Sequence, residues 1–573
     1  MKLRKFNKTY ILNKLKNRNN KRLKITTIVC SICLLVGAII YFSFARFEAT
    51  ESFNLINGTA ADSGDYVIAA YVDGTRVGDF PEPSDNVSFD SITCNNNADA
   101  YFDEGSWSAV VNTTKSNTRC SVNFKTNNNK WQLPGGVDLY NGMVPIVFDG
   151  NTIKVANTSS KWYDYNNHEW ANAALVTSSA RSKSAGSTLD MSEILQMYVW
   201  IPRYAYKIWD KTSNQSNEQI INIKFMSSTQ RDIAGYVTHP AFKFGNTELN
   251  GFWVGKFEPS TTTGIWTATD NSFCTSIGCA NAANLRIIPN TISLTNINVA
   301  NEFNASRTIE SDSTFGLTAS QVDTHMMKNT EWGAVAYLSQ SRYGIFNYDG
   351  TCANESQAAD STCKVFINNI NVGYGNDTNS NSLSFQWGPT VTGCSAAGAN
   401  TAVSNTHNQT NPTCANNYTW NTNGVLASTT GNKTGVYDMS GGAWEYVAGN
   451  MANSTTTYTY NAKNSGLSTQ PEDKYLDHYL AIATDTTTMS DDNQAKVQNR
   501  GILGDATSEV IKTYGNLQGG WNSDYASFVS SSHPWFIRGG RADNVSVAGV
   551  FAFSRLGGGR IASGSFRVVL SAQ

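Results

Sequence analysis

The chain has 573 residues and a formal net charge of −2; charged residues make up 15% of it and aromatic residues 11%. The first 24 residues hold ten of the 43 Lys and Arg residues and no acid, which leaves 33 basic residues against 45 Asp and Glu, a formal charge of −12, in the remainder. That charge argues against a nucleic-acid partner, because phosphate backbones are bound mainly by Lys and Arg.

A membrane anchor is predicted directly after this basic leader (residues 1–24). Residues 25–45 carry no charge, and a helix of 21 residues spans about 30 Å, the thickness of the hydrocarbon core. The positive-inside rule keeps the leader in the cytoplasm and places the bulk of this single-pass chain outside the cell membrane. A cleaved signal peptide is the alternative, since Ser43 and Ala45 are small residues at suitable positions. Both interpretations export the remaining chain.

The ten cysteines form two groups. Cys30 and Cys33 lie in the apolar run, whereas the other eight are neighbours along the chain without CxxC spacing. In an oxidising compartment we expect local disulfides that pin long loops, with a metal site as the alternative, although spacing alone does not prove connectivity. The predicted pairs are Cys94 with Cys120, Cys274 with Cys279, Cys352 with Cys363, and Cys394 with Cys414.

Residues 46–127 are predicted to form a small all-β domain. Val67–Val72 is rich in residues that favour strands, and Asp73-Gly74 follows it as a hairpin signal. The polar stretch 125–130 predicts a linker. Residues 131–573 would then form the second domain.

One helix is predicted from Ser320 to Ser339. Ser320 and Asp323 have capping-box-like spacing, and Val322, Met326, Gly333 and Tyr337 recur on one side. A second helix is predicted from Leu189 to Met197, before a strand at Tyr198–Ile201. Residues 345–430 are mostly Asn, Thr and Ser and are predicted to be long loops held by two disulfides.

Four motifs occur in a fixed order along the second domain. They are GFWVGKFE at Gly251–Glu258, EWGAVAYL at Glu331–Leu338, GVYDMSGGAWEYV at Gly435–Val447, and the terminal pair Arg538–Gly540 and Ser565–Leu570. Together they resemble the sulfatase-modifying-factor branch of the C-type lectin fold, the fold of formylglycine-generating enzymes. The resemblance covers residues 197–573. It implies an α+β, C-type lectin-like domain with a mixed, mostly antiparallel core, two helices and long disulfide-pinned loops.

Aromatic and aliphatic residues in these motifs are expected to build the core. Phe252, Trp253 and Phe257 alternate around a strand, and Tyr437 and Trp444 flank the Gly441-Gly442 turn. On the closing strand the alternating residues are Phe566, Val568 and Leu570.

The resemblance does not extend to the activity of formylglycine-generating enzymes. Those enzymes need a redox-active cysteine pair, which also holds copper, between the Arg-Gly-Gly turn and the last strand, and Arg541–Gly564 contains no cysteine. No catalytic residue and no cofactor are therefore predicted. An enzyme with another mechanism is the alternative, for which His325 and His533 are the candidate residues. Calcium binding is left open, because Asp and Asn are plentiful in loops but no EF-hand spacing occurs.

The segment Arg541–Gly564 has an unusual composition for its position between two scaffold motifs. It resembles the variable region of diversity-generating retroelement proteins, in which randomised template adenines turn an Asn codon into many residues but never Lys, Glu, Gln, Trp or Met. None of those five occurs here. An ordinary Gly- and Ser-rich loop is the alternative. Within the segment, Ala548–Phe553 is predicted to be a short buried strand.

Two groups of surface residues flank this strand, and their three arginines favour a negatively charged partner. The predicted ligand-binding residues are Arg541, Ala542, Asp543, Asn544, Val545, Ser546, Val547, Ser554, Arg555, Leu556, Gly557, Gly559, Arg560, Ile561, Ala562 and Ser563.

The sequence therefore predicts a bacterial surface protein that displays a non-catalytic, lectin-like binding domain with a variable C-terminal surface. Its expected partner is a protein or a cell-surface ligand. The alternatives are an enzyme of the sulfatase-modifying-factor type and an invariant structural adhesin of the envelope.

Overall fold

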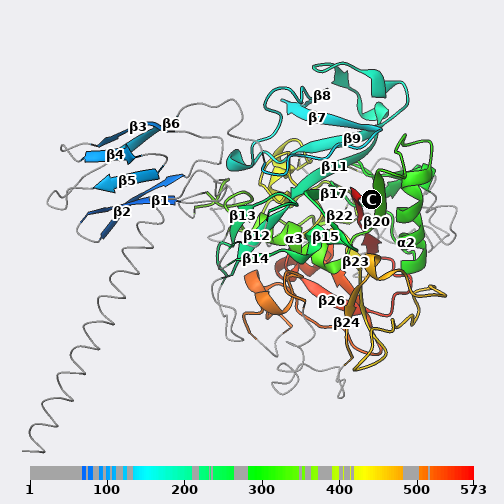
Figure 1. Ribbon diagram of the computed structural model, residues 1–573. Coiled ribbons are helices and arrows are strands. Elements are labelled where there is room, and N and C mark those ends of the chain that lie inside the picture. Colours follow the sequence, from blue (N-terminus) through cyan, green and yellow to red (C-terminus); the bar gives the residue numbers. More distant parts are fainter. Residues whose placement is uncertain are drawn as a thin grey trace, which may run out of the picture. The chain divides into compact units, whose positions relative to one another are not determined.

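A computed structural model describes most of the chain after residue 132 (Figure 1). The described residues are 133–208, 218–230, 233, 236–262, 282–347, 351–354, 363–371, 390–398, 413–414, 418–481, 502–513 and 517–573, with the backbone of strands before residue 125 and at 404–405. The predicted anchor at 25–45 and the pair Cys274 and Cys279 lie outside them. No helix within the described residues is long and apolar enough to cross a membrane.

The chain divides into two compact units, Met1–Lys130 and Trp131–Gln573. The described part of the first contains three antiparallel strand pairs: β1 (Val67–Val72) with β2 (Thr75–Pro81), β3 (Phe89–Cys94) with β6 (Cys120–Phe124), and β4 (Asp99–Asp103) with β5 (Ser106–Val110). The predicted strand Val67–Val72 is confirmed, and it pairs with β2 so that Val72 lies opposite Thr75. The strand register also places Cys94 opposite Cys120, as the predicted disulfide requires.

An eight-stranded antiparallel sheet forms the centre of the second unit. Its order is β10 (Thr188–Leu189), β8 (Thr152–Val155), β7 (Met143–Asp149), β9 (Asn172–Val176), β11 (Ile194–Pro202), β17 (Gly251–Gly255), β28 (Val568–Ala572) and β20 (Val322–Met326). Every residue of β9, β11, β17 and β20 is buried, so both faces of the sheet centre are covered. The C-terminal strand β28 lies inside the sheet, which ties the chain end into the core.

A smaller mixed sheet carries parts of the last two sequence motifs. Its strands are β24 (Asp477–Tyr479), β23 (Trp444–Met451), β25 (Trp535–Arg538) and β26 (Phe553–Leu556), and β27 (Gly564–Phe566) pairs with β23. The remaining strands are β12 (Tyr204–Lys207), β13 (Asn222–Phe225), β14 (Val237–Thr238), β15 (Lys243–Phe244), β16 (Thr247–Glu248), β18 (Ser260–Thr261), β19 (Leu285–Arg286), β21 (Ile370–Asn371) and β22 (Ser404–Asn405). The described part of the chain is thus mostly sheet with few helices.

The predicted helix from Ser320 to Ser339 is wrong in its first half. Residues Val322–Met326 form strand β20, because they pair with β28 across the sheet. The helix α3 covers only Asn329–Ser339, and it begins where the Glu331 carboxylate accepts the Lys328 backbone N–H at 2.8 Å. A helix that was not predicted, α2 (Val299–Thr308), starts at Asn298, whose side chain caps it, and lies beside β20 (Figure 1).

The helix predicted from Leu189 to Met197 is also wrong. Only Met191–Glu193 forms a single 3-10 turn, and β11 begins at Ile194 because it pairs with β9 on one side and β17 on the other. The predicted strand Tyr198–Ile201 is confirmed as the second half of β11.

Two of the predicted disulfides are confirmed within the described residues. Cys352 bonds Cys363 across 11 residues, and Cys394 bonds Cys414 across 20 residues. Both close loops in the region that was predicted to be irregular. A cross-link of this span stabilises a fold by about 3 kcal/mol, mainly by restricting the unfolded chain.

Candidate ligand-binding surface

The first group of predicted contact residues follows strand β25. Gly539 and Gly540, with φ of 85° and 81°, turn the chain, and a Cβ on Gly540 would lie 2.7 Å from Ala548. Residues Ala542–Val547 then form a 3-10 helix, which we call segment A together with Arg541. In segment A Ser546 is exposed, Ala542 is buried, and the others are half-buried.

Segment A is held largely through main-chain atoms. The Ala542 N–H donates to Gly442 O at 2.8 Å, and Val547 O accepts the Tyr525 N–H at 2.9 Å. The side chains interact within the segment: Arg541 pairs with Asp543, and Asn544 Oδ1 accepts the Arg541 N–H at 3.0 Å.

The second group, segment B, comprises Ser554–Ser563. Ser554–Leu556 belong to β26 and pair with β25. The following loop is again held by its carbonyl groups. Gly557 O, Gly558 O, Gly559 O and Ile561 O accept hydrogen bonds from Asn464 N, Val299 N, Tyr446 Oη and Asn296 N. Arg560 is exposed and Ser563 is buried, whereas most of the remainder is half-buried.

The Gly442–Trp444 turn brings the two segments together. Gly442 O accepts from the Ala542 N–H of segment A, and the Trp444 N–H donates to Ser563 O of segment B at 2.8 Å. The Trp444 ring meets the Tyr525 ring edge-on at a centroid distance of 6.1 Å. Tyr525 is half-buried and Trp444 is almost fully buried. Aromatic residues of this kind usually belong to a core, so the sequence did not predict that these two lie at this surface.

The predicted strand at Ala548–Phe553 is wrong except for its last residue. This stretch is buried as expected, but β26 begins only at Phe553. Before it, the Ala552 N–H donates to Gly549 O, three residues back, at 2.9 Å, which is a turn that a straight strand would not allow. Ala542 and Ser563, both predicted to contact a ligand, are 2% and 6% exposed and therefore contribute chiefly their backbones.

The predicted cluster of three positive charges is altered by local pairing. Arg541 is paired with Asp543, and Arg555 Nη1 donates to Phe528 O at 2.8 Å. Arg560 alone of the three is exposed. The surface is consequently less cationic than the sequence indicated.

A buried ionic frame lies beneath the turn. Arg567, between β27 and β28, pairs with Glu445 and donates to Gly255 O at 2.7 Å and to Tyr437 O at 3.0 Å. Glu258 Oε1 accepts the Ala443 N–H at 2.7 Å. Burial and the neighbouring Asp438 raise the pKa of Glu258 well above its ordinary value. These groups fix the turn from below.

Gly441 and Gly442 are required by this packing. Their φ values are 75° and 70°, and a Cβ on Gly442 would meet the Glu258 carboxylate. The predicted core role of Tyr437 is confirmed. Phe566, Val568 and Leu570 are buried too, although Phe566 belongs to β27, whereas Val568 and Leu570 belong to β28.

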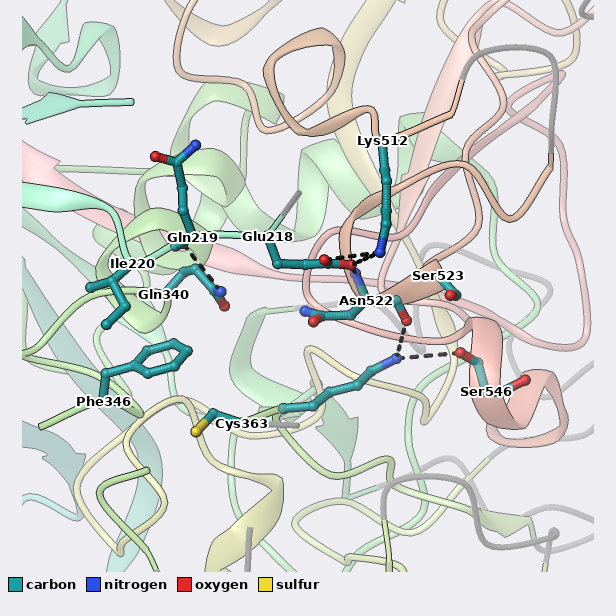
Figure 2. A pocket seen from close by; sticks show the side chains of 11 residues that line it. Glu218, Gln219, Ile220, Gln340, Phe346, Cys363, Lys512, Asn522, Ser523 and Ser546 are labelled. Carbon is teal, nitrogen blue, oxygen red and sulfur yellow. Dashed lines mark hydrogen bonds and ion pairs between the residues drawn. The ribbon is translucent and has the colours of Figure 1, made fainter. Parts of the chain in front are cut away.

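A cavity of about 480 Å³ opens beside segment A (Figure 2). It is lined by Glu218, Gln219, Ile220, Gln340, Phe346, Cys363, Lys364, Lys512, Asn522, Ser523 and Ser546. Ser546 is the one predicted contact residue among them. The other lining residues come from several separate stretches of chain, so no sequence motif pointed to this site.

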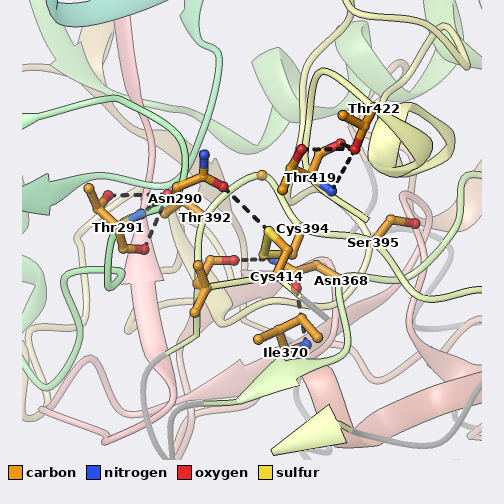
Figure 3. The surroundings of a disulfide bond; sticks show 12 residues. Asn290, Thr291, Asn368, Ile370, Thr392, Cys394, Ser395, Cys414, Thr419 and Thr422 are labelled. Carbon is orange, nitrogen blue, oxygen red and sulfur yellow. Dashed lines mark hydrogen bonds between the residues drawn. A yellow bond between two sulfur atoms is a disulfide. The ribbon is translucent and has the colours of Figure 1, made fainter. Parts of the chain in front are cut away.

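The Cys394–Cys414 disulfide is connected to the same frame (Figure 3). Cys414 Sγ lies 3.4 Å from Asn290 Oδ1, and Asn368 Nδ2 donates to Val391 O at 2.8 Å. Asn368 Nδ2 also donates to Asp438 Oδ1 at 2.9 Å, as does the Gly393 N–H. The cross-linked loop thus supports Asp438, which lies shortly before the glycine turn.

The two candidate histidines of an enzymatic alternative occupy different environments. His325 is fully buried, with Nδ1 3.0 Å from Asp323 and Nε2 3.0 Å from Glu331, and its ring stacks on Phe244. Burial lowers the pKa of His325, but the two carboxylates outweigh it and the net shift is upward. His533 is exposed in a turn next to Ser532. In the described part of the chain, no group of three or more His, Cys, Asp or Glu residues is placed to hold a metal ion.

Comparison with known proteins gives no further assignment. No protein-family model matches the chain. No curated protein matches it either.

Proposed function

We propose that the second unit is a C-type lectin-like scaffold of the sulfatase-modifying-factor branch that binds a ligand without catalysis. Its binding surface consists of segments A and B on either side of the Gly442–Trp444 turn. Residues 25–45 anchor the chain in the bacterial membrane and leave this unit outside. The partner is a protein or another ligand on a cell surface.

The fold supports this proposal through the positions of its motifs. GFWVGKFE forms β17, EWGAVAYL lies in α3, GVYDMSGGAWEYV leads into β23, and SFRVVL joins β27 to β28. Lys256 and Arg567 link these motifs, since Lys256 O accepts the Tyr437 N–H and Arg567 bonds Glu445. Three of the four motifs therefore meet in one buried frame.

The observation that carries the proposal is the way the two segments are attached. Their contacts with the frame run mostly through N–H and C=O groups of Ala542, Val547, Gly557, Gly559, Ile561 and Ser563. Main-chain bonds do not depend on side-chain identity. Half-buried side chains in these segments can therefore change while the backbone stays in place, which is what a diversified binding surface needs.

The surface chemistry favours a partner with mixed polarity over a strongly anionic one. Segment A balances Arg541 with Asp543, and Arg560 supplies the exposed positive charge of segment B. Val545, Leu556 and Ile561 add half-buried apolar area between the polar groups. Such a mixture is typical of surfaces that bind proteins.

The DNA that surrounds the coding sequence provides the first test. We expect a near-copy of the last ~100 bases, differing from the coding copy only at adenines and lying beside a reverse transcriptase gene. Sequencing the gene from many cells of one population should show changes at codons of segments A and B only. An invariant 3′ end without a nearby copy would contradict diversification and would leave an ordinary adhesin.

Binding itself is tested with the full-length chain. Cells that display it should retain a ligand-bearing surface, and exchange of Arg560, Ile561 and Ser546 should abolish retention. A matched exchange of the exposed Tyr458, Leu503 and Leu517 should have no effect. Equal loss in both sets would show that retention depends on general surface properties, not on segments A and B.

A further inference from the structure

The cavity beside segment A combines charges that cancel one another. Glu218 accepts two hydrogen bonds from Lys512 Nζ at 3.0 Å and one from the Asn522 N–H at 2.7 Å. Buried Lys364, which also lines the cavity, pairs with Asp524 at 2.7 Å and donates to Asn522 O at 3.3 Å. Two acids and two lysines therefore neutralise each other in pairs, and a ligand with a net charge would disturb one of them.

The pKa values agree with ionised pairs at neutral pH. Burial would raise the pKa of Glu218, but hydrogen bonds, including those from Lys512, bring it below its ordinary value. Burial raises the pKa of Asp524 to about 6, against the opposing effect of Lys364. Both carboxylates are consequently charged at pH 7.

Neutral hydrogen-bonding groups also line the cavity. Figure 2 shows the side-chain amides of Gln340 and Asn522 pointing toward each other across the cavity, with Ser523 and Ser546 on the Asn522 side. Gln340 makes a long bond of 3.4 Å to Gln219 O, which leaves its amide with further donor and acceptor capacity. Amides and hydroxyls that both donate and accept are suited to a ligand with hydroxyl groups.

One end of the cavity is apolar. Phe346, which is 9% exposed, and Ile220 form that end, and the neighbouring Cys363 is fixed by its disulfide to Cys352. A ring face beside amides provides a surface for the C–H face of a sugar ring while its hydroxyls meet the polar groups. The volume falls in the usual range for small-molecule sites.

The backbone on the polar side has an unfavourable conformation. Asn522 and Ser523 have φ of 58° and 62°, and Val545, next to Ser546, has φ of 47° with ψ of −108°. Three non-glycine residues in such conformations cost about 1–3 kcal/mol each. Strain concentrated around one cavity is a feature of binding sites, because the surrounding structure must hold the polar groups in place.

We infer that this cavity binds an uncharged, hydroxyl-rich small ligand, namely one or two rings of a neutral saccharide. This site goes beyond the proposed protein- or cell-facing surface, because its occupant and its principal residues differ. Ser546 is the residue that the two share, and its identity would tune which sugar is accepted.

Saturation-transfer NMR with the full-length chain tests the inference. The probes are glucose, galactose, N-acetylglucosamine, maltose and lactose, with glucuronic acid and glucosamine as charged counterparts. We expect at least one neutral sugar to bind with a dissociation constant of about 1 mM. The charged counterparts should bind at least tenfold more weakly.

Two variants distinguish binding in the cavity from nonspecific binding elsewhere on the protein. Asn522→Gly removes one amide but suits the positive φ, so the fold should persist while affinity falls at least tenfold. Ser546→Trp should block the cavity from its exposed side. Arg560→Ala, in segment B, should leave sugar binding intact and affect only the surface ligand.

Failure of all five neutral sugars to bind at millimolar concentrations would overturn the inference. So would binding that survives both Asn522→Gly and Ser546→Trp. Either result would leave the proposed surface of segments A and B unaffected, since exchange of Arg560 and Ile561, which do not line the cavity, tests that surface without Ser546.

Discussion

Different kinds of contact hold the structure on the two sides of the Gly442–Trp444 turn. Below the turn, Glu258, Glu445 and Arg567 are fully buried and each side chain makes specific bonds. Above it, segments A and B are attached mainly through backbone atoms. Side-chain identity is thus fixed in the lower region and largely free in the upper one. A fold can in this way keep its shape while its surface changes.

Removing the charge of Arg567 should have the largest effect. Arg567→Met leaves Glu445 buried without its partner, so we expect a loss of about 3–5 kcal/mol in unfolding free energy or no soluble protein. Denaturant unfolding measures the change. Arg560→Met, in segment B, should change stability by less than about 0.5 kcal/mol. Similar losses in both variants would remove the distinction between the two regions.

Removing the Cys394–Cys414 disulfide should cause the second-largest loss of stability. The double variant Cys394→Ser with Cys414→Ser should lose about 3 kcal/mol, because the unfolded chain regains freedom over a 20-residue span. The same change at Cys352 and Cys363, which span 11 residues, should cost slightly less. Chemical unfolding without reductant compares the two. A larger loss at the shorter loop would argue against this explanation.

Adding one methyl group to the turn should have an intermediate effect. Gly442→Ala combines a positive φ with contact against Glu258, and we expect a loss of about 2 kcal/mol. Gly557→Ala in segment B is the control, because its Cβ would have no neighbour closer than 3.5 Å. Thermal unfolding should show a lower Tm for the first variant and an unchanged Tm for the second. The reverse order would contradict the packing described.

The smallest expected effect is a dependence on pH from His325. Because its folded pKa is raised, its protonated form stabilises the fold fully below the unfolded pKa of about 6.5, and this contribution is lost as pH rises through the folded pKa. For each pKa unit by which the folded value exceeds the unfolded one, the free energy of unfolding gains about 1.4 kcal/mol. The stability difference between the wild type and His325→Phe should shrink from pH 6 to pH 9. A difference that grows over this range would show that His325 is buried in its neutral form.

The sequence predicted local features better than long-range pairing. The strands Val67–Val72 and Tyr198–Ile201 follow from short-range signals, and two local disulfides followed from spacing. Helical spacing at Val322–Met326 was misleading, because pairing with β28 outweighs local preference. The turn at Ala548–Ala552 was mistaken for a strand, since burial alone does not distinguish the two.

The candidate surface was only partly accessible from sequence. Composition marked Arg541–Ser563, but the pairing of Arg541 with Asp543 and the burial of Ser563 depend on the folded backbone. The Trp444–Tyr525 ring pair joins residues 81 positions apart in a contact that no periodicity reveals. The cavity is even less predictable, because its walls come from several separate stretches of chain.

A chain with several replacements in segments A and B tests the central claim most directly. Arg541, Ser546, Arg555, Arg560 and Ile561 would be exchanged together for Asn, Asp, Gly, Ser and Val, and thermal unfolding compared with the wild type. If backbone bonds hold the segments, unfolding stays cooperative and the Tm falls by only a few degrees. Loss of cooperative unfolding would show that the side chains themselves hold this surface, and would contradict the account.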